Sequence, residues 1–506
     1  MNNNIFAQNA KIAATMTVTE NGHPVASTTG AAVLDLYGQI GALRNADDDR
    51  ICELFDRAYA ENPLLAVRTV FYGRDARGGC GERKIFRTLL KHMADRGMTD
   101  ILTKNLNNIP FYGRWDDMYS FVGTSMQELA FVAIYNQLMD DLRNSRVLGP
   151  VSLLAKWLKS PNASSKETCK LGRLTAKKLG YSEKQYRQVL AYLREKIRIV
   201  EREMSANNWK DIRYEAVPSR AGLIYRDAFK KHDEERYNAY IQAVKNGEKK
   251  INTAVNTPQD LVHVYLENGY SVSHIVDETV EAMWKNLPDF VNSDENILCM
   301  VDVSGSMRGR PMEISTGLGM YFAQKNRGAF HNLFMTFESE PSFVSIEDDC
   351  TMLDNLRTTL RAPWGGSTNL NKAFKEMLRF AKAHNVPESD MPTRMIVISD
   401  MEFDEANGCY GYNYMTGRHM STDLHIDELR EMYRNAGYEM PQIIYWNVDS
   451  RDNHFHTRSD TEGVMLASGS SPAVFKAVME IKELDITPYD AMVEVLNGER
   501  YSRVVV

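Results

Sequence analysis

Apolar residues recur at three- and four-residue steps through most of the chain between about Asp47 and Leu287. This spacing places apolar side chains on one face of an α-helix. The clearest examples are DRICELFDRAYA, RKIFRTLLKHMADRG, SMQELAFVAIYNQLMDDLRN and SEKQYRQVLAYLREKIRIVEREM. Many successive helices without intervening strands predict an α-solenoid or a helical ring. No strict repeat period is present, so a conventional helical bundle stays open as the alternative.

Two stretches depart from this helical pattern. Near the N-terminus, TMTVTENGHPVAST has β-forming residues on both sides of Asn21-Gly22, which predicts a short hairpin. After Asn292, short apolar runs alternate with helical stretches: NILCMVDV, NLFMTF, SFVSI, RMIVISD and QIIYWNVD. Apolar strands alternating with helices predict a parallel sheet covered on both faces. We therefore expect an α+β multidomain protein, with an all-α region at 1–290 that carries the hairpin and an α/β domain at 291–506.

Composition supports this division and excludes several classes of protein. A chain of 506 residues is too long for one hydrophobic core, and 43% hydrophobic with 25% charged residues is typical of a globular protein. The six cysteines contain no C-x-x-C pair, which disfavours a zinc framework or a disulfide scaffold. No apolar run reaches the roughly 18–20 residues of a membrane span, and no secretory signal is visible. We expect a cytoplasmic protein without a membrane partner.

The charged residues are unevenly distributed along the chain. From Asp141 to Lys250, 25 Lys and Arg residues face 13 Asp and Glu residues; from Val291 to Val506 the numbers are 20 and 32. A basic middle and an acidic C-terminal part suggest two regions with different partners. Charge counting alone favours the simpler interpretation, in which the basic side chains only solvate outward helix faces.

Five oxygen-bearing side chains follow the predicted strands or open a helix. Asp302, Ser304 and Ser306 come directly after NILCMV, Thr368 lies in the glycine-rich GGSTNL, and Asp400 ends RMIVIS. The carboxyl ends of parallel strands gather at one edge of a sheet, so we expect these loops to meet there.

Hydroxyl and carboxylate oxygens are the ligands that Mg²⁺ prefers, and Mn²⁺ accepts the same set. Two aspartates would roughly balance the charge of the ion, and they bind it directly or through water. One coordination position should remain for an outside oxygen, such as a carboxylate or a phosphate. The absence of His and Cys from this set disfavours zinc.

These residues resemble the metal-ion-dependent adhesion site of the von Willebrand factor A fold, in strand order and in all three loops. The resemblance implies a doubly wound, Rossmann-like α/β domain. It also implies that Ser304, Ser306 and Thr368 touch the metal, while Asp302 and Asp400 act directly or through water. Met401 and Glu402 follow Asp400, where that family commonly has a glycine, so this loop is expected to run differently.

An enzymatic interpretation is weaker. A phosphatase that forms an aspartyl-phosphate on Asp302 would usually carry a second acid at the position of Ser304, and a lysine after RMIVIS. The chain also lacks a phosphate-binding loop, H-E-x-x-H and G-x-S-x-G. We therefore name no catalytic residue.

The helical half resembles a family that joins a TROVE-like helical region to a von Willebrand A domain. The resemblance rests on FYGRDARGGCGERKIFRTLLKHM, NIPFYGRWDDMYSFVG, LLAKWLKSP and NWKDIRYEAVPSRAGLIYRDAFKKHD. It extends more distantly to the Ro autoantigen architecture, in which a HEAT-like ring of helices closes on such a domain. That architecture implies a ribonucleoprotein that binds small structured RNAs outside the ring and single-stranded RNA ends in its channel.

The basic middle of the chain is compatible with RNA binding, because cations neutralise phosphates and aromatic rings stack on bases. Trp157, Tyr186 and Tyr192 accompany the cations, although aromatic residues at helical spacing are more often buried. The candidate RNA contacts are Lys156, Lys159, Lys170, Arg173, Lys177, Lys178, Arg187, Arg194 and Arg198.

Together these features predict a non-catalytic RNA-binding scaffold with a metal-dependent site for an acidic group. The main alternative is a metal-dependent protein–protein interaction module without RNA binding. A metal-dependent phosphatase ranks third.

Overall fold

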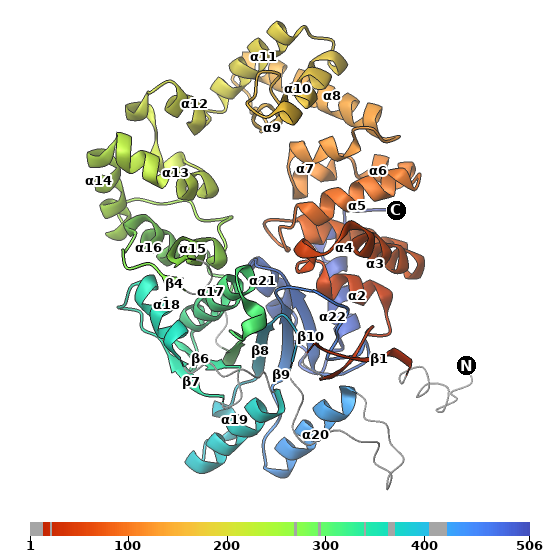
Figure 1. Cartoon of the computed structure of the whole chain (residues 1–506), viewed down its shortest axis with the longest axis vertical. Helices are drawn as coiled ribbons and strands as arrows, with labels where there is room; N and C mark the ends of the chain where they lie inside the picture. The colour runs from red at the N-terminus through yellow and green to blue at the C-terminus, as the bar shows by residue number, and fades with distance from the viewer. Residues whose placement is uncertain are drawn as a thin grey trace.

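The computed structural model describes residues 14–20, 23–267, 271–291, 295–337, 341–362, 370–403 and 422–506. Within these residues the fold is α+β, as the sequence predicts, with a long helical region followed by an α/β domain. The helical region forms an arch that starts and ends on the α/β domain (Figure 1).

The arch consists of α-helices joined by short turns and 3-10 segments. Its helices are α2 (Ala32–Gln39), α3 (Asp48–Glu61), α4 (Pro63–Arg74), α5 (Lys84–Asp95), α6 (Thr99–Asn105), α7 (Asn108–Tyr112), α8 (Gln127–Arg146), α9 (Leu154–Trp157), α10 (Lys166–Lys178), α11 (Glu183–Lys196), α12 (Val200–Ser205), α13 (Ser219–His232), α14 (Glu234–Lys245), α15 (Pro258–Tyr265) and α16 (Glu278–Lys285). The 3-10 segments are η1 (Leu43–Asn45), η2 (Trp115–Phe121), η3 (Trp209–Asp211) and η4 (Tyr214–Ala216), and a two-residue pair, β3 (Leu266–Glu267) and β4 (Ser271–Val272), precedes α16.

Capping residues explain where several of these helices begin. At α11 the Ser182 hydroxyl accepts the Gln185 backbone N–H, and the Gln185 side chain accepts the Ser182 backbone N–H in return. The apolar pattern after Ser182 continues beyond α11, yet the structure breaks it before α12. Arg198 has a φ of +50° between the two helices, so one continuous periodic stretch becomes two helices.

The α/β domain has a six-stranded sheet in the order β10-β9-β8-β5-β6-β7. All neighbouring pairs are parallel except β6 and β7. The strands are β5 (Ile297–Val301), β6 (Leu333–Thr336), β7 (Phe343–Ser345), β8 (Arg394–Ser399), β9 (Gln442–Asn447) and β10 (Val464–Ser468). The accompanying helices are α17 (Arg310–Lys325), α18 (Met352–Arg361), α19 (Leu370–His384), α20 (Thr422–Asn435), α21 (Ala473–Glu480) and α22 (Pro488–Asn497).

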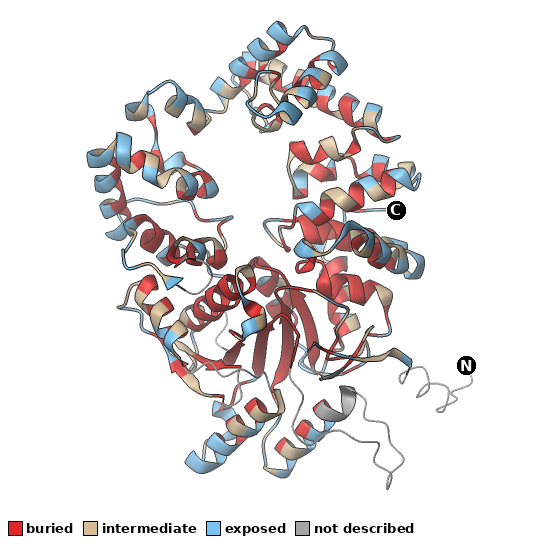
Figure 2. Cartoon of the chain, viewed as in Figure 1, coloured by how far each residue is buried: buried red, intermediate tan, exposed pale blue. Residues whose placement is uncertain are grey.

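Burial explains why the central strands read as continuous apolar runs. Every residue of β5, β8, β9 and β10 is buried, as a parallel sheet covered on both faces requires (Figure 2). The sequence pattern identifies five of the six strands and misses β10. Most of α17 is buried as well, because α15 of the arch packs directly on it.

Both ends of the arch dock on the α/β domain. At the first end α2 packs on β10 and α22; at the other end α15 and α16 pack on α17 and α18. The first contact is close: a Cβ on Gly41 would lie 2.4 Å from the Ser468 carbonyl oxygen. Only a glycine permits that backbone approach.

The two ends of the described chain strengthen this closure. After η7 (Glu499–Tyr501), the C-terminal segment lies against the arch, where the Asn105 side chain donates to the Val505 carbonyl at 2.6 Å. The hairpin strands β1 (Met16–Val18) and β2 (Pro24–Ala26) are antiparallel and pair with the α/β domain through Ala26 and Phe455. The expected turn residues Asn21 and Gly22 lie outside the described residues.

Candidate functional site

Three strand ends of the α/β domain bring polar side chains to one edge of the sheet. Asp302 follows β5, Asp400 follows β8, and a loop carrying Arg451 follows β9. Because β5, β8 and β9 are adjacent and parallel, these loops emerge side by side. Thr368 lies outside the described residues, so its predicted place beside them stays a prediction.

Asp302 is the most buried carboxylate of this group, with 1% of its surface exposed. Its Oδ1 accepts the backbone N–H of Ser304 at 2.8 Å, and its Oδ2 accepts the Ser399 hydroxyl at 2.6 Å. Burial, together with the nearby charge of Asp400, raises the pKa of Asp302 to about 7. A nearby cation would stabilise the ionised form of this carboxylate and lower its pKa.

The hydroxyls of Ser304 and Ser306 are hydrogen-bonded to each other, with their Oγ atoms 3.0 Å apart. Two adjacent ligands of an octahedral Mg²⁺, each about 2.1 Å from the ion, lie about 3.0 Å from one another. The serine pair therefore fits a shared hard cation. Burial raises the pKa of Asp400, and a hydrogen bond from the Ser306 side chain opposes that shift, which places Asp400 next to the same pair.

The backbone after Asp400 takes the conformation usually reserved for glycine, although the residue is Met401. Its φ is +67°, in the left-handed region that costs an ordinary residue about 1–2 kcal/mol. Three contacts hold this conformation: the Met401 N–H donates to the Ser399 hydroxyl at 3.1 Å, the Glu402 N–H donates to Asp400 at 3.2 Å, and His456 contacts the Met401 carbonyl at 2.9 Å. These contacts with buried neighbours thus stabilise a positive φ that only a glycine adopts at little cost.

Arg451 is a functional candidate that our sequence reasoning missed. Its Nη2 lies 3.0 Å from Asp400 Oδ2 and also donates to the Ser306 carbonyl, while Nη1 lies 3.3 Å from Glu20. The guanidinium therefore bridges the β8 loop, the serine turn and the N-terminal hairpin. The available signal was its position two residues after the apolar run QIIYWNVD.

A second polar group lies beside this site, where ligand atoms of Glu402, Asp452 and His454 fall within 4.8 Å of one another. Burial raises the pKa of Glu402, but hydrogen bonds from His454 and from the Glu20 N–H outweigh it and leave the pKa below its ordinary value. The His454 Nδ1 to Glu402 Oε1 distance of 2.7 Å shows that these two already partner each other.

The predicted RNA contacts fall into two structural groups. Lys170, Lys177, Arg187 and Arg198 are exposed on or near α10 and α11. Of these four, Arg187 also donates to the Glu183 carbonyl at 3.4 Å. The other five have ion-pair partners or several backbone partners: Lys156 with Glu201, Lys159 with Asp116, Arg173 with Glu183, Lys178 with Glu128, and Arg194 with backbone groups.

Arg194 differs from the rest because its guanidinium is held inside the arch. It donates to the carbonyls of Ala155 and Leu158, each at 2.9 Å, and to the Ser160 hydroxyl at 3.1 Å. These hydrogen bonds hold α9 and the segment that follows it against α11. This geometry favours a framework role for Arg194 over a phosphate contact.

The accompanying aromatic residues also separate. Tyr186 is fully buried and Tyr192 is 37% exposed. The Trp157 ring is covered by the Arg114 guanidinium, whose central carbon lies 3.9 Å from the ring centroid. Of the three aromatics, Tyr186 belongs to the core.

A basic cluster lies on α4, α5, η2 and the segment after α9, and its cations are Arg74, Arg87, Arg114 and Lys159. Two buried carboxylates, Asp116 and Asp117, are surrounded by cations. The distances are 2.9 Å for Arg74–Asp117, 2.6 Å for Arg87–Asp117, 3.0 Å for Arg87–Asp116, 2.9 Å for Arg114–Asp116 and 3.5 Å for Lys159–Asp116. From the sequence, Trp115-Asp116-Asp117 is expected to be structural, with Arg114 or Arg83 as a possible ion-pair partner. Of these two arginines, Arg114 forms the ion pair, and the sequence does not predict that the other cations gather here.

Arg83 adds a cation that is partly exposed and partly buried to this cluster. Burial of the guanidinium and the charges of Arg114 and Arg87 lower its pKa. No ion pair of Arg83 is found within the part of the chain that the structure describes. With Arg83 included, five cations face two carboxylates, so the cluster carries surplus positive charge.

The structure thus defines an α/β domain with an oxygen-rich site at its strand ends, and a helical arch that docks on this domain at both ends and carries a basic cluster. Two families match successive parts of this chain: a domain of unknown function, DUF2828, at residues 144–294, and a domain of unknown function, DUF7788, at residues 296–501. The boundary between them falls just before β5.

Similarity extends over almost the whole chain in one curated protein. The uncharacterized protein L728 of Acanthamoeba polyphaga mimivirus is 25% identical over 523 residues, which covers 96% of this chain and 87% of L728. Among solved structures, the crystal structure of the Deinococcus radiodurans RO (RSR) protein aligns with 77% of this chain and 92% of its own, at 13% identity and a TM-score of 0.36. Within the described residues, no helix is long and apolar enough to span a bilayer.

Proposed function

We propose that this chain is a non-catalytic RNA-binding scaffold of the Ro type, in which a helical ring and a von Willebrand A-like domain form one unit. The observation that carries the proposal is the surplus of positive charge around Asp116 and Asp117. Because the cations outnumber the carboxylates, some positive charge is available to bind RNA phosphates. Such binding releases counterions from the RNA. The exposed cations of α10 and α11 extend this basic surface along the arch.

The arrangement at Arg114 and Trp157 supports single-stranded RNA in particular. An arginine plane stacked on an indole ring offers both a charge and a flat surface, and unpaired bases stack on such surfaces without sequence preference. Backbone contacts by arginine and lysine position a strand but do not read its sequence. We therefore expect binding that is strongly salt-dependent and weakly sequence-specific.

The oxygen-rich site would serve a second purpose in this scaffold. Asp302, Ser304, Ser306 and Asp400 would hold Mg²⁺ or Mn²⁺, with Thr368 as a further ligand. A bound ion would offer an open coordination position to a carboxylate of a protein partner or of the same chain. Asp302 and Asp400 supply the negative charge, and the serine hydroxyls supply neutral ligands at the spacing that a hard cation needs.

The RNA proposal is tested by fluorescence anisotropy with labelled single-stranded and hairpin RNAs over a series of salt concentrations. The logarithm of the binding constant should fall linearly with the logarithm of salt, with a slope of roughly 0.7 per phosphate contacted for single strands. The triple variant Arg83→Gln, Lys170→Gln, Lys177→Gln should weaken binding and reduce this slope. These three side chains are exposed, so the fold is expected to survive the changes.

Arg379→Gln is the matched control, because Arg379 is 71% exposed on α19, outside the arch, and pairs only with Glu376 among the described residues. It should bind RNA like the unmodified protein. Absence of RNA binding at low salt, or equal binding by the triple variant, would refute the proposal. Metal-dependent capture of an acidic partner without RNA binding would favour the interaction-module alternative.

A further inference from the structure

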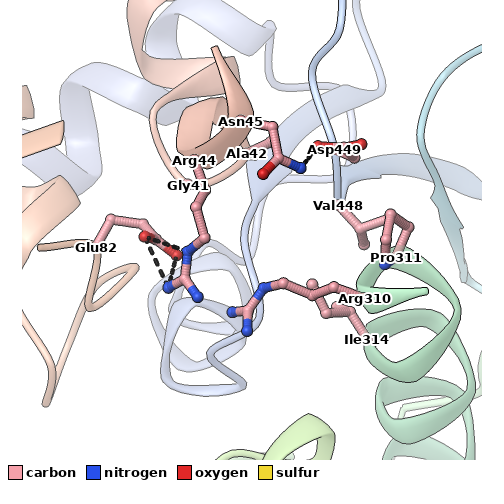
Figure 3. A pocket seen from close by; sticks show the side chains of 10 residues that line it. All are labelled: Gly41, Ala42, Arg44, Asn45, Glu82, Arg310, Pro311, Ile314, Val448 and Asp449. Atoms are coloured by element: carbon pink, nitrogen blue, oxygen red, sulfur yellow. Dashed lines mark hydrogen bonds and ion pairs between the residues drawn. The ribbon is translucent and has the colours of Figure 1, made fainter. Parts of the chain in front are cut away.

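A small pocket lies at the seam between the first end of the arch and the α/β domain (Figure 3). Arg44 and Asn45 of η1 and Glu82 come from the arch; Arg310 at the start of α17 and Asp449 after β9 come from the α/β domain. The pocket exists only because the two parts are docked. Its cavity volume is about 10 Å³.

The guanidinium groups of Arg44 and Arg310 point toward one another across this pocket (Figure 3). Arg44 is held by Glu82, with Nε and Nη2 at 2.8 to 3.0 Å from the carboxylate oxygens. Its remaining nitrogen, Nη1, has no hydrogen-bond partner among the residues that the structure describes. The edge of Arg44 that faces Arg310 therefore keeps a hydrogen-bond donor available for a ligand.

Arg310 is a partly buried cation whose nearby carboxylates are all engaged elsewhere. Apart from Glu82, the carboxylates that act most strongly on its charge are those of Asp260 and Glu313. Asp260 pairs with Arg220, and Glu313 accepts from the Gln259 side chain at 2.6 Å. Across the described part of the chain, Arg310 forms no ion pair, and its recorded hydrogen bond reaches the Ser470 hydroxyl at 3.4 Å.

The remaining acid of the pocket does not neutralise Arg310 either. Asp449 accepts from the Asn45 side chain at 3.1 Å, and its other oxygen lies 3.6 Å from Arg451. Its carboxylate points away from the Arg310 guanidinium (Figure 3). The space between Arg44 and Arg310 is thus flanked by two like charges with no acid between them.

We propose that this pocket binds one phosphate group between the guanidiniums of Arg44 and Arg310. Two guanidiniums that face each other repel, and a tetrahedral oxyanion between them converts the repulsion into charge-assisted hydrogen bonds. The small size of the pocket excludes a base or a sugar from its interior, so a terminal phosphate, a backbone phosphate or free phosphate fits, and an uncharged nucleoside does not.

The location gives this site a structural consequence. Arg44 belongs to the arch and Arg310 to the α/β domain, so one bound phosphate links the two parts. Binding should therefore stabilise the docked arrangement, because a ligand that binds only the docked form favours it. The pocket uses different residues from the basic cluster, so the proposal goes beyond RNA binding and does not depend on it.

The test measures inorganic phosphate binding to the full-length protein by calorimetry, and the shift of its unfolding midpoint with phosphate concentration. Arg310→Gln should weaken phosphate binding at least about tenfold, since a charge-assisted hydrogen bond contributes roughly 1.5–3 kcal/mol. Arg310→Lys keeps the charge but loses the planar fork and should bind with intermediate affinity. Arg379→Gln removes an exposed arginine charge outside the pocket and should bind phosphate normally.

A competition arm distinguishes the two sources of phosphate. If single-stranded RNA displaces inorganic phosphate from the unmodified protein, the group bound is an RNA phosphate; if it does not, the site takes a free anion. Equal phosphate affinity of Arg310→Gln and the unmodified protein, or no phosphate binding by the unmodified protein, would overturn the proposal. Loss of phosphate binding in Arg310→Gln in a protein that binds no RNA would uphold this site while refuting the RNA function.

Discussion

Asp302→Asn should make the metal-free protein more stable at neutral and higher pH. Asp302 is buried beside Asp400, and its pKa is raised from 3.8 to about 7. In the unfolded chain the carboxyl ionises near its ordinary value, so the folded state holds a proton that the unfolded state has released. Stability contributed by the protonated form is complete below about pH 4 and is lost as pH rises through about 7.

The size of the effect follows from the pKa shift. At about 1.4 kcal/mol per pKa unit, a rise from 3.8 to about 7 corresponds to at most about 5 kcal/mol. Asparagine carries no charge and keeps an oxygen for the Ser304 N–H, which donates to Asp302 at 2.8 Å. The Ser399 hydroxyl can rotate to accept from the new amide. The substitution therefore removes the charge at little cost in hydrogen bonds.

The assay compares thermal unfolding of the two proteins in a chelator across pH 4 to pH 8. The difference in midpoint between Asp302→Asn and the unmodified protein should be small near pH 4, should grow with pH and should level off above about pH 7. Adding Mg²⁺ at pH 8 should raise the midpoint of the unmodified protein and leave that of the variant nearly unchanged. A variant that is less stable than the unmodified protein at pH 8, or a difference independent of pH, would refute the reasoning.

Three further changes test contacts in other parts of the molecule. Arg451→Gln removes the ion pair with Asp400, and it should destabilise the metal-free protein by about 2 kcal/mol while tightening Mg²⁺ binding in a calorimetric titration, because a competing cation is gone. Arg74→Met leaves the fully buried Asp117 with one arginine fewer and should cost about 3 kcal/mol, measured as a lower thermal midpoint. Gly41→Ala places a Cβ 2.4 Å from a carbonyl oxygen of β10 and should increase proteolysis at the seam; unchanged protease resistance would show that the arch end docks less tightly.

The sequence pattern predicted those features that depend on neighbouring residues alone, namely the buried strands and the residues at their ends. The runs NILCMVDV, RMIVISD and QIIYWNVD became β5, β8 and β9, because continuous burial on both faces requires apolar side chains at every position. The same logic located Asp302 and Asp400 at strand ends. It missed β10, whose five buried residues Val464–Ser468 include an alanine and a serine and end beside Gly469, so that the segment resembles a loop.

The features that sequence could not predict depend on contacts between distant residues. The C-terminal segment closes the arch through Asn105 and Val505, which are separated by 400 positions. The left-handed conformation at Met401 depends on partners such as His456, 55 positions away. No pattern within one segment carries this information, because each partner is an ordinary residue in its own neighbourhood.

The position of Arg451 shows how these two levels combine at the candidate site. A strand-end rule would have drawn attention to the loop after β9, but only the fold shows that its guanidinium reaches Asp400 and the Ser306 carbonyl at once. Loss of Arg451 would leave the charge of the buried Asp400 unsatisfied, so the proposed divalent ion would be an alternative way to neutralise Asp400. The same side chain also contacts Glu20 of the hairpin, so any exchange between arginine and metal would be transmitted to the N-terminal strand pair. The metal affinity of this domain is therefore expected to depend on the N-terminal hairpin as well as on the five predicted ligands.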